Sequence, residues 1–282
     1  MATDFTTSWL DLPLLRLRVR TVGAGPAIVL THGLLVDGRI WDEVAIDIAA
    51  RGYQVVLPDL PLGAHTVPVK DRSQLTTRAV ADAIFDMADA LDIDRFALLG
   101  FDTGGALAQV ATASNFARID RLALMSCDAF EHFPPALIRP FQWATRWSPL
   151  MTLVLKSLGS PRLQHRPLPL GLVAKHKIDP RLIAAWSEPS LSNPAIREDC
   201  VAFIKQMSSA DTLWAAAKLT EFPGPSMVMW SREDRIFPRR DAQRLADLLP
   251  GCQLRWIDDS YVFASLDNPE RMKTLVDEFL AL

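Results

Sequence analysis

The strongest sign of chemistry in the sequence is an aspartate inside the segment Gly100-Phe101-Asp102-Thr103-Gly104. An apolar run precedes it and a run of small residues follows it, which predicts a strand, a sharp turn and a helix. Glycines two residues before and two residues after the tip allow such a turn to be tight. The tip then lies at the N-terminus of a helix, where the backbone dipole favours an anion. The pattern predicts that Asp102 is a reactive carboxylate.

A glycine-rich turn of this kind also occurs in nucleotide-binding folds. Only two of the three glycines that such a fold requires can be matched here, and no acidic residue ends the next expected strand. The nucleotide-binding interpretation therefore explains fewer residues than a reactive aspartate does.

The elements that must position Asp102 alternate between short apolar runs and segments with helical periodicity. This rhythm predicts an α/β fold with a parallel sheet covered by helices. Strands are expected at residues 14–20, 27–31, 54–57, 96–99, 122–125, 227–230 and 253–257, and helices at 41–50, 75–91, 106–113, 239–249 and 269–282.

The rhythm disappears between residues 130 and 220, a proline-rich stretch that holds four of the eight tryptophans. We expect several helices there that cover the ends of the strands as a cap, or lid. The predicted division is a core of residues 1–129 and 221–282 with a helical cap at 130–220. A separate helical domain is the alternative, but no polar or Gly/Ser linker flanks the stretch.

Two further segments, Thr31-His32-Gly33-Leu34 and Trp230-Ser231-Arg232-Glu233-Asp234, lie on either side of the Asp102 turn. Together the three segments resemble the motifs of the α/β-hydrolase superfamily, and the resemblance covers nearly the whole chain. It implies a mostly parallel eight-stranded sheet with helices on both faces and a helical cap inserted after strand 6.

The resemblance also implies roles for individual residues. The backbone N–H groups of Leu34 and Thr103 would form the oxyanion hole, and Asp234 would be the supporting acid. The matched motif residues are His32, Gly33, Gly100 and Gly104.

An aspartate at the tip of the turn resembles haloalkane dehalogenases and epoxide hydrolases, in which this carboxylate attacks carbon and forms an ester. A histidine then activates the water that cleaves the ester. Here the segment that aligns with that histidine reads Asp259-Ser260-Tyr261-Val262-Phe263, so valine stands where the histidine belongs. No histidine follows His176 in the chain, so no shift of register restores one.

Residues specific to either enzyme class are also replaced. Thr103 and Leu34 stand where many dehalogenases have the tryptophan and asparagine that hold halide. Tyr53 and Tyr261 are the only tyrosines, and neither lies in the expected cap, where epoxide hydrolases place their acids.

Two residues could replace the missing histidine as the base that activates water. His132 follows the expected sixth strand and begins the cap, and Asp128 ends that strand. Asp128 could instead cap the first helix of the cap. Carboxylates crowded at one sheet edge cannot all remain ionised, so one pKa should rise towards neutrality. His32 is expected to be structural, and His65, His165 and His176 are expected in solvated positions.

Aromatic residues near these positions predict an apolar pocket and a small hydrophobic substrate. They are Phe101, Phe130, Phe133, Trp143, Trp147, Trp186 and Tyr261.

Three functions remain open at this point. The first is a hydrolase that uses Asp102 on an ester, an epoxide or a carbon–halogen bond. The second is a non-hydrolytic acid–base enzyme such as a lyase, isomerase or cyclase, and the third is a ligand-binding protein.

Composition excludes several other classes. With a net charge of −3 and scattered basic residues, the sequence predicts neither a nucleic-acid partner nor a membrane surface. No secretory signal or membrane span is expected, and three cysteines without metal-ligand spacing indicate a reduced cytoplasmic protein. No metal or other cofactor is expected. The oligomeric state stays open, with a homodimer among the options.

Overall fold

The structure is a computed structural model, and it describes residues 4–144, 153 and 170–282. It confirms the predicted fold: eight strands form one sheet in the order β1-β2-β4-β3-β5-β6-β7-β8. The pairs β1–β2 and β2–β4 are antiparallel, and every other pair is parallel. The strands are β1 (Thr6–Asp11), β2 (Arg16–Val22), β3 (Ala27–Thr31), β4 (Gln54–Pro58), β5 (Phe96–Asp102), β6 (Ile119–Cys127), β7 (Ser226–Ser231) and β8 (Gln253–Ile257).

The strand β1 has no counterpart among the strands expected from the apolar pattern. It lies at the edge of the sheet, and most of its side chains are exposed or only partly buried. Because it buries little apolar surface, its sequence carries no strong alternation of apolar and polar residues. Its pairing with β2 is what makes it a strand.

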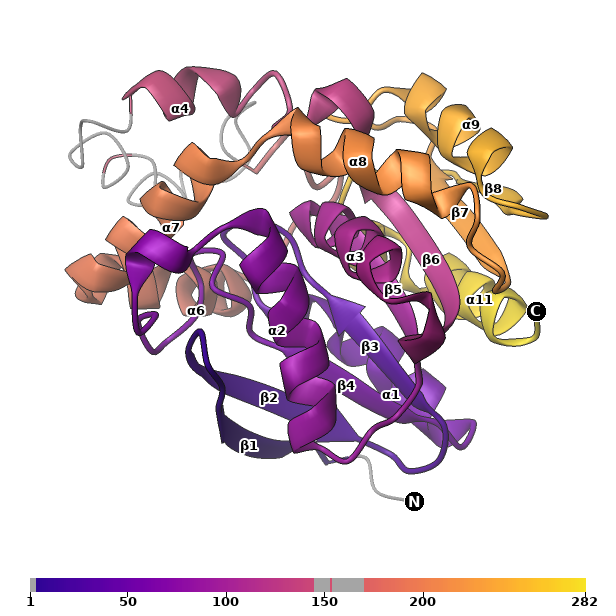
Figure 1. Cartoon of the computed structure of the whole chain (residues 1–282), viewed down its shortest axis with the longest axis horizontal. Helices are drawn as coiled ribbons and strands as arrows, with labels where there is room; N and C mark the ends of the chain where they lie inside the picture. The colour runs from indigo at the N-terminus through magenta and orange to yellow at the C-terminus, as the bar shows by residue number, and fades with distance from the viewer. Residues whose placement is uncertain (1–3, 145–152, 154–169) are drawn as a thin grey trace.

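Helices cover both faces of the sheet, as expected (Figure 1). The helices α2, α3 and α8 lie in front of the sheet in this view, and α1 and α11 lie behind it. The helices outside the cap region are α1 (Asp42–Ala50), α2 (Thr77–Ala90), α3 (Thr103–Ser114), α9 (Arg239–Leu248), α10 (Ala264–Asp267) and α11 (Pro269–Leu280), with short 3-10 turns η1 (Gly38–Trp41), η2 (Arg72–Gln74) and η3 (Phe116–Arg118).

The helix α2 illustrates how the sequence pattern becomes structure. The Thr76 side chain accepts a hydrogen bond from the backbone N–H of Ala79 at 3.2 Å and so caps the helix. Val80, Ile84 and Met87 recur at helical spacing and are all buried. Burial of this apolar stripe against the sheet is what stabilises the helix.

Between β6 and β7 the described chain is helical. It contains η4 (Phe130–His132), α4 (Arg139–Ala144), α6 (Pro180–Ser192), α7 (Pro194–Gln206) and α8 (Ser209–Leu219). The helices α4, α7 and α6 lie on the left side of Figure 1, whereas α8 packs along α3. The predicted cap, residues 130–220, thus includes α8, which contacts α3 of the core. The division into core and cap stays a prediction.

In the part of the chain that the structure describes, no helix is both long enough and apolar enough to cross a membrane.

The parallel strands bring the sequence motifs to one edge of the sheet. The strands β3, β5, β6, β7 and β8 are successive neighbours, and their carboxyl ends point the same way. Asp102 ends β5, Asp128 follows β6, and Asp234 follows β7. Parallel strand order therefore places the three carboxyl groups along a single edge.

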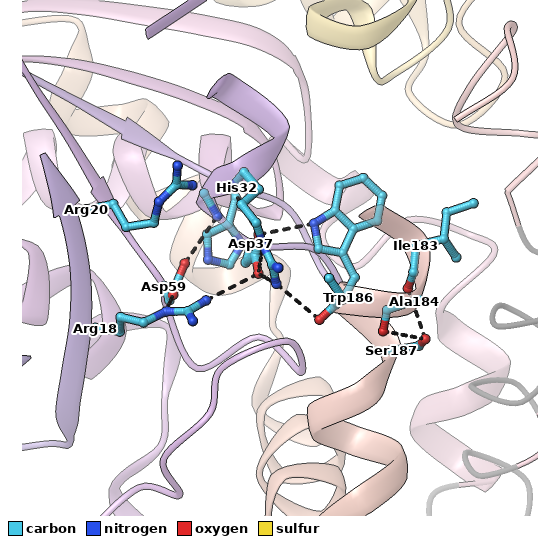
Figure 2. Close-up of polar contacts among 12 residues, drawn as sticks. Arg18, Arg20, His32, Asp37, Asp59, Ile183, Ala184, Trp186 and Ser187 are labelled. Atoms are coloured by element: carbon cyan, nitrogen blue, oxygen red, sulfur yellow. Dashed lines mark hydrogen bonds and ion pairs between the residues drawn. The ribbon is translucent and has the colours of Figure 1, made fainter. Parts of the chain in front are cut away.

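The loop after β3, which carries Leu34, is fastened to α6 through Asp37 (Figure 2). The buried carboxylate of Asp37 accepts a hydrogen bond from the indole Nε1 of Trp186 at 3.1 Å. It also pairs with Arg39, whose guanidinium donates to the backbone carbonyl of Ala185 at 3.1 Å. The loop and the helix are thus joined at two points.

The same loop is fastened to β4 by a second set of contacts (Figure 2). Asp59 forms an ion pair with Arg18 and accepts a hydrogen bond from the backbone N–H of Gly38 at 3.2 Å. Beside it, Nε2 of buried His32 accepts a hydrogen bond from the backbone N–H of Leu60 at 2.9 Å. His32 is therefore structural, because its ring organises the backbone around Leu34.

Two glycines let α3 approach its neighbours more closely than a side chain permits. A β-carbon on Gly104 would lie 2.4 Å from the carbonyl oxygen of His32. One on Gly105 would lie 2.3 Å from the β-carbon of Cys127 in β6. The position of Asp102 therefore depends on residues that have no side chain.

The substitution Gly105→Ala should lower the free energy of unfolding by about 3 kcal/mol, since the added methyl group overlaps packed atoms. Denaturant unfolding measures the change. A suitable control is Gly52→Ala, because Gly52 has φ +89° but no heavy atom within 4 Å of the added carbon. The control should lower the free energy of unfolding only through the strain of its left-handed backbone conformation, by about 1 kcal/mol. Equal losses in the two variants would contradict the packing argument.

Candidate active site

Asp102 occupies a strained backbone conformation at the junction of β5 and α3. Its φ is 53° and its ψ is −134°, and the residue is the N-cap of α3. A positive φ is costly for a residue with a side chain and persists only where the surroundings enforce it. Gly33 lies so close that an added β-carbon would be 2.5 Å from Oδ1 of Asp102. The turn thus presents the aspartate where the loop after β3 meets α3.

Two backbone N–H groups converge on one oxygen of this aspartate. Oδ1 of Asp102 accepts a hydrogen bond from the N–H of Leu34 at 3.0 Å and from the N–H of Thr103 at 2.6 Å. These are the two groups that the sequence predicted as oxyanion donors. Neither backbone N–H contacts Oδ2, and the side chain of Thr103 also lies close enough to the carboxyl group to lower its pKa. One oxygen is held and the other remains available to react.

The electrostatic environment of Asp102 favours its protonated form more than water does. Burial raises the pKa of Asp102 above its ordinary value, and the hydrogen bonds from Thr103 and Leu34 offset only part of the effect. A carboxylate that is poorly solvated in this way is a stronger nucleophile than one at the surface.

Asp128 is the second carboxyl group of the site and is only 1% exposed. Its Oδ2 accepts a hydrogen bond from the hydroxyl of Thr103 at 3.2 Å, and its backbone N–H donates to the carbonyl of Asp102 at 3.3 Å. Its Oδ1 is buried and has no partner among the described residues. Burial and then the charge of Asp102 raise the pKa of Asp128 well above the usual range. This carboxyl group therefore holds its proton far more tightly than an exposed aspartate.

Asp234 is the third carboxyl group. Its Oδ1 accepts hydrogen bonds from the backbone N–H groups of Ile236 and Phe237, both at 2.8 Å. Its Oδ2 is buried without a partner in the described part of the chain. Burial raises the pKa of Asp234 to about 6 and the charge of Asp102 adds to this, against hydrogen bonds that lower it. Asp234 therefore titrates near neutral pH.

Val262 lies in the loop after β8 and is completely buried. The loop is fixed on both sides of it: the N–H of Tyr261 donates to Asp267 at 2.9 Å, and the N–H of Phe263 donates to the carbonyl of Val173 at 2.8 Å. Its isopropyl group offers no hydrogen bond, which leaves Oδ2 of Asp234 without the imidazole that the family resemblance would supply. No histidine within the described ranges hydrogen-bonds to any of the three carboxyl groups.

His132, one of the two bases considered from the sequence, contacts residues of α9. Its Nδ1 contacts Asp241 of α9 at 2.5 Å, and its Nε2 lies 2.9 Å from the guanidinium of Arg240. Both ring nitrogens are therefore engaged by α9, and we do not retain His132 as a base. Position in the sequence placed it near the sheet edge, but the helix that packs beside it determines where its ring points.

His65 and His176 also have partners outside the site. His65 is buried rather than solvated, because its ring contacts the N–H of Gly63 and the carboxylate of Asp199 in α7, each at 3.3 Å. His176 is half exposed and contacts Asp259 at 3.2 Å. His165 lies outside the described residues.

A row of aromatic rings links α6 to the residue before Asp102. Ring centroids are 6.1 Å apart for Trp186 and Phe263, 5.8 Å for Phe263 and Phe101, and 5.3 Å for Phe101 and Trp41. Phe101 and Trp186 were predicted from the sequence, whereas Phe263 and Trp41 were not singled out. Rings packed edge to face in this way form a rigid apolar wall.

The remaining predicted pocket residues have other surroundings. The ring of Phe130 lies 3.8 Å below the guanidinium of Arg244, and that of Tyr261 lies 4.1 Å below Arg235. Phe133 is buried. Trp147 and the side chain of Trp143 lie outside the described residues.

One group of side chains has the composition of a metal site: Glu131, His132 and Asp241. Arg244 forms ion pairs with both acidic members, and Arg240 contacts the imidazole. These two guanidinium groups already supply the positive charge that a metal ion would bring. The arrangement fits an ion-pair network better than a metal centre.

Two contributors to the site escaped sequence reasoning. Ser126 has φ 28°, accepts a hydrogen bond from the N–H of Ser231 at 3.1 Å and lowers the pKa of Asp234. Asp37 holds the loop of Leu34. Asp37 stands three residues after Leu34 and is followed by a glycine. An aspartate before a glycine is typical of a turn, and this is the one sequence signal that could have marked Asp37.

Comparisons with other proteins agree with the fold. An uncharacterized protein of Mycobacterium tuberculosis is 28% identical over 276 residues, which cover 93% of this chain and 77% of that protein. A 2-hydroxy-6-oxononadienedioate/2-hydroxy-6-oxononatrienedioate hydrolase of Cupriavidus pinatubonensis is 25% identical over 274 residues, covering 94% and 90% respectively.

Among solved structures, haloalkane dehalogenase DbeA from Bradyrhizobium elkani superposes with a TM-score of 0.80. The identity is 19%, and the match covers 99% of this chain and 98% of that one. The family model described as alpha/beta hydrolase fold matches residues 26–269. With its parallel sheet, its sharp turn at Asp102 and this match, the chain belongs to the α/β-hydrolase fold family.

Proposed function

We propose that the protein is a hydrolase of a small hydrophobic substrate and that Asp102 is its nucleophile. The observation that carries this proposal is the pair of backbone N–H groups on Oδ1 of Asp102, which leaves Oδ2 free. The hydrolase from Cupriavidus pinatubonensis supports hydrolysis as the class of reaction. The substrate would carry an electrophilic carbon, as in an epoxide, an alkyl halide or an ester.

In the first step, Oδ2 of Asp102 attacks the carbon and the leaving group departs with the electron pair of its bond. With an alkyl halide or an epoxide the product is an alkyl ester of Asp102, and the epoxide oxygen stays attached and takes up a proton; an ester substrate would instead acylate Asp102 and give a mixed anhydride. The aromatic row Trp186–Phe263–Phe101 supports an apolar substrate, because it places rings next to the strand that ends at Asp102. The contacts between Asp37 and Trp186 support a cap that closes over the site from α6.

In the second step, water adds to the carboxyl carbon of Asp102 and negative charge develops on Oδ1. The N–H groups of Leu34 and Thr103 already point at this oxygen, so they stabilise the charge without rearrangement. Their geometry suits cleavage of an ester formed on the aspartate itself.

Intact-protein mass spectrometry tests the proposal directly. We expect one covalent adduct per chain after exposure to styrene oxide, 1-bromohexane or 4-nitrophenyl butyrate, and no adduct on Asp102→Asn. Asparagine is the matched control because its side-chain oxygen can still accept from Leu34 and Thr103. An adduct that also forms on the control, or neither an adduct nor released product with the unmodified protein, would refute Asp102 as nucleophile.

The rate of adduct formation should depend on pH. Only the ionised carboxylate attacks, so the rate is highest above the pKa of Asp102 and falls as the pH falls through it. Because burial raises this pKa, the midpoint should lie above the ordinary aspartate value of about 3.9. Adduct formation from 1-bromohexane, measured at a series of pH values where circular dichroism shows the protein folded, provides the test. A rate that stays constant down to about pH 4 would contradict it.

Restoring the histidine should accelerate cleavage of the ester. In Val262→His, an imidazole nitrogen can donate to the free Oδ2 of Asp234, and the opposite nitrogen can activate water. General-base assistance predicts that the adduct decays about 100-fold faster than in the unmodified sequence. The control is Val262→Leu, which adds bulk without a base. If leucine accelerates decay as much as histidine, altered packing rather than base catalysis is responsible.

A second function, acid–base catalysis without an ester, is favoured by one observation. Asp102, Asp128 and Asp234 all have raised pKa values and no imidazole beside them in the described chain. Such a site could move protons in a lyase or isomerase reaction. Reaction in ¹⁸O-labelled water separates the two, because only cleavage of an ester puts the label into Asp102.

A further inference from the structure

We propose that Asp128 is the base that activates water against the Asp102 ester, in place of the absent histidine. The inference rests on the proposed role of Asp102 as nucleophile and extends it. It assigns a catalytic task to a buried carboxyl group that the first step does not use.

The first argument is position. Asp128 follows β6, the strand next to β5, and one residue joins it to the nucleophile. Thr103 donates its backbone N–H to Oδ1 of Asp102 at 2.6 Å and its hydroxyl to Oδ2 of Asp128 at 3.2 Å. The backbone N–H of Asp128 also contacts the carbonyl of Asp102. Asp234 has no such link in the described chain, since its Oδ1 accepts from the N–H groups of its own loop and Ser126 is the side chain that lowers its pKa.

The second argument is the free oxygen. Thr103 orients Asp128 through Oδ2, while Oδ1 is buried and unpartnered among the described residues. Buried polar atoms in folded proteins are nearly always paired, so a free carboxyl oxygen beside a reactive group is a site for a water proton. Valine at position 262 provides no competing base.

The third argument is the change of charge during the reaction. While Asp102 is a carboxylate, its negative charge helps to keep Asp128 protonated. The ester is neutral, so its formation removes that repulsion and lowers the pKa of Asp128. Although burial still raises its pKa, Asp128 therefore becomes easier to deprotonate at the stage when a base is needed.

Other ionisable groups around Asp128 do not reverse this argument. Burial raises the pKa of the Cys127 thiol, and the charges of Asp128, Asp241, Asp102 and Asp234 raise it further. All four carboxyl groups therefore lie within electrostatic reach of this thiol. Asp241 forms an ion pair with Arg244 and contacts the ring of His132. Loss of the charge on Asp102 when the ester forms either leaves the pKa of Asp234 unchanged or lowers it. Asp102 is therefore the one carboxyl group of the three that loses a negative charge.

The chemical step balances as follows. Water forms a bond to the carboxyl carbon of the ester and gives one proton to Oδ1 of Asp128. The electron pair of the carbonyl moves to Oδ1 of Asp102, where Leu34 and Thr103 hold it. Collapse of this intermediate expels the alkoxide, which takes the proton from Asp128. Asp102 returns to its free carboxyl form, and once it is again charged, Asp128 takes up a proton from solvent.

The test isolates the second step. The 1-bromohexane ester is formed first, excess reagent is removed, and decay of the adduct is followed by intact mass in ¹⁸O-labelled water. We expect Asp128→Asn to slow the decay about 100-fold, because asparagine cannot accept a proton. Asp94→Asn removes an exposed aspartate before β5 and should decay like the unmodified protein.

A second variant keeps the test decisive if Asp128→Asn perturbs the fold. In Val262→His/Asp128→Asn, decay should return, because the new imidazole performs the task of Asp128 on the same ester. Decay in Asp128→Asn at the normal rate, loss of decay in Asp234→Asn alone, or an ester that never decays in the unmodified protein would each overturn the inference while leaving Asp102 as nucleophile. Failure of the unmodified protein to form any ester would overturn the proposed function as well.

Discussion

The convergence of two backbone N–H groups on one oxygen of Asp102 is the constraint on which the site depends. One N–H comes from the loop after β3 and the other from the first residue of α3. They can meet only because Gly33, Gly104 and Gly105 let the loop, the helix and β6 approach within distances that a side chain would forbid. The strained φ of Asp102 is maintained by the same close packing. Burial raises the pKa of this carboxyl group, and the two backbone N–H groups engage only one of its oxygens.

The three carboxyl groups at the sheet edge have different roles because their environments differ. Oδ1 of Asp102 is held by two donors, Asp128 is tied to Thr103 by a single hydroxyl, and Asp234 is anchored to its own loop. Burial raises the pKa of all three, so the charged state of all three together is disfavoured. A site built in this way can exchange one negative charge between neighbours as an ester forms and is cleaved. Such an exchange would give the protein a route to turnover that does not require histidine at position 262.

The loop after β3 also connects the reaction centre to the helices between β6 and β7. Asp37 joins it to Trp186 and, through Arg39, to the backbone of α6 (Figure 2). Trp186 in turn packs edge to face on Phe263, the neighbour of Val262. Oxyanion donor, aromatic wall and helix α6 therefore form one connected unit, so a shift of α6 would be transmitted to the N–H of Leu34.

How much of this was predictable depends on how far apart the interacting residues lie in the chain. Several features are visible in the sequence, because glycine spacing and apolar periodicity involve residues only a few positions apart. They are the turn at Asp102, the His-Gly segment, the replacement of histidine by Val262 and the α/β rhythm. Tertiary structure alone decided that His132 turns towards Asp241, that β1 joins the sheet, that Asp37 reaches Trp186 and that Thr103 bridges Asp102 and Asp128. Most of these partners are separated by many residues, up to 149 positions for Asp37 and Trp186, and packing rather than local pattern selects them.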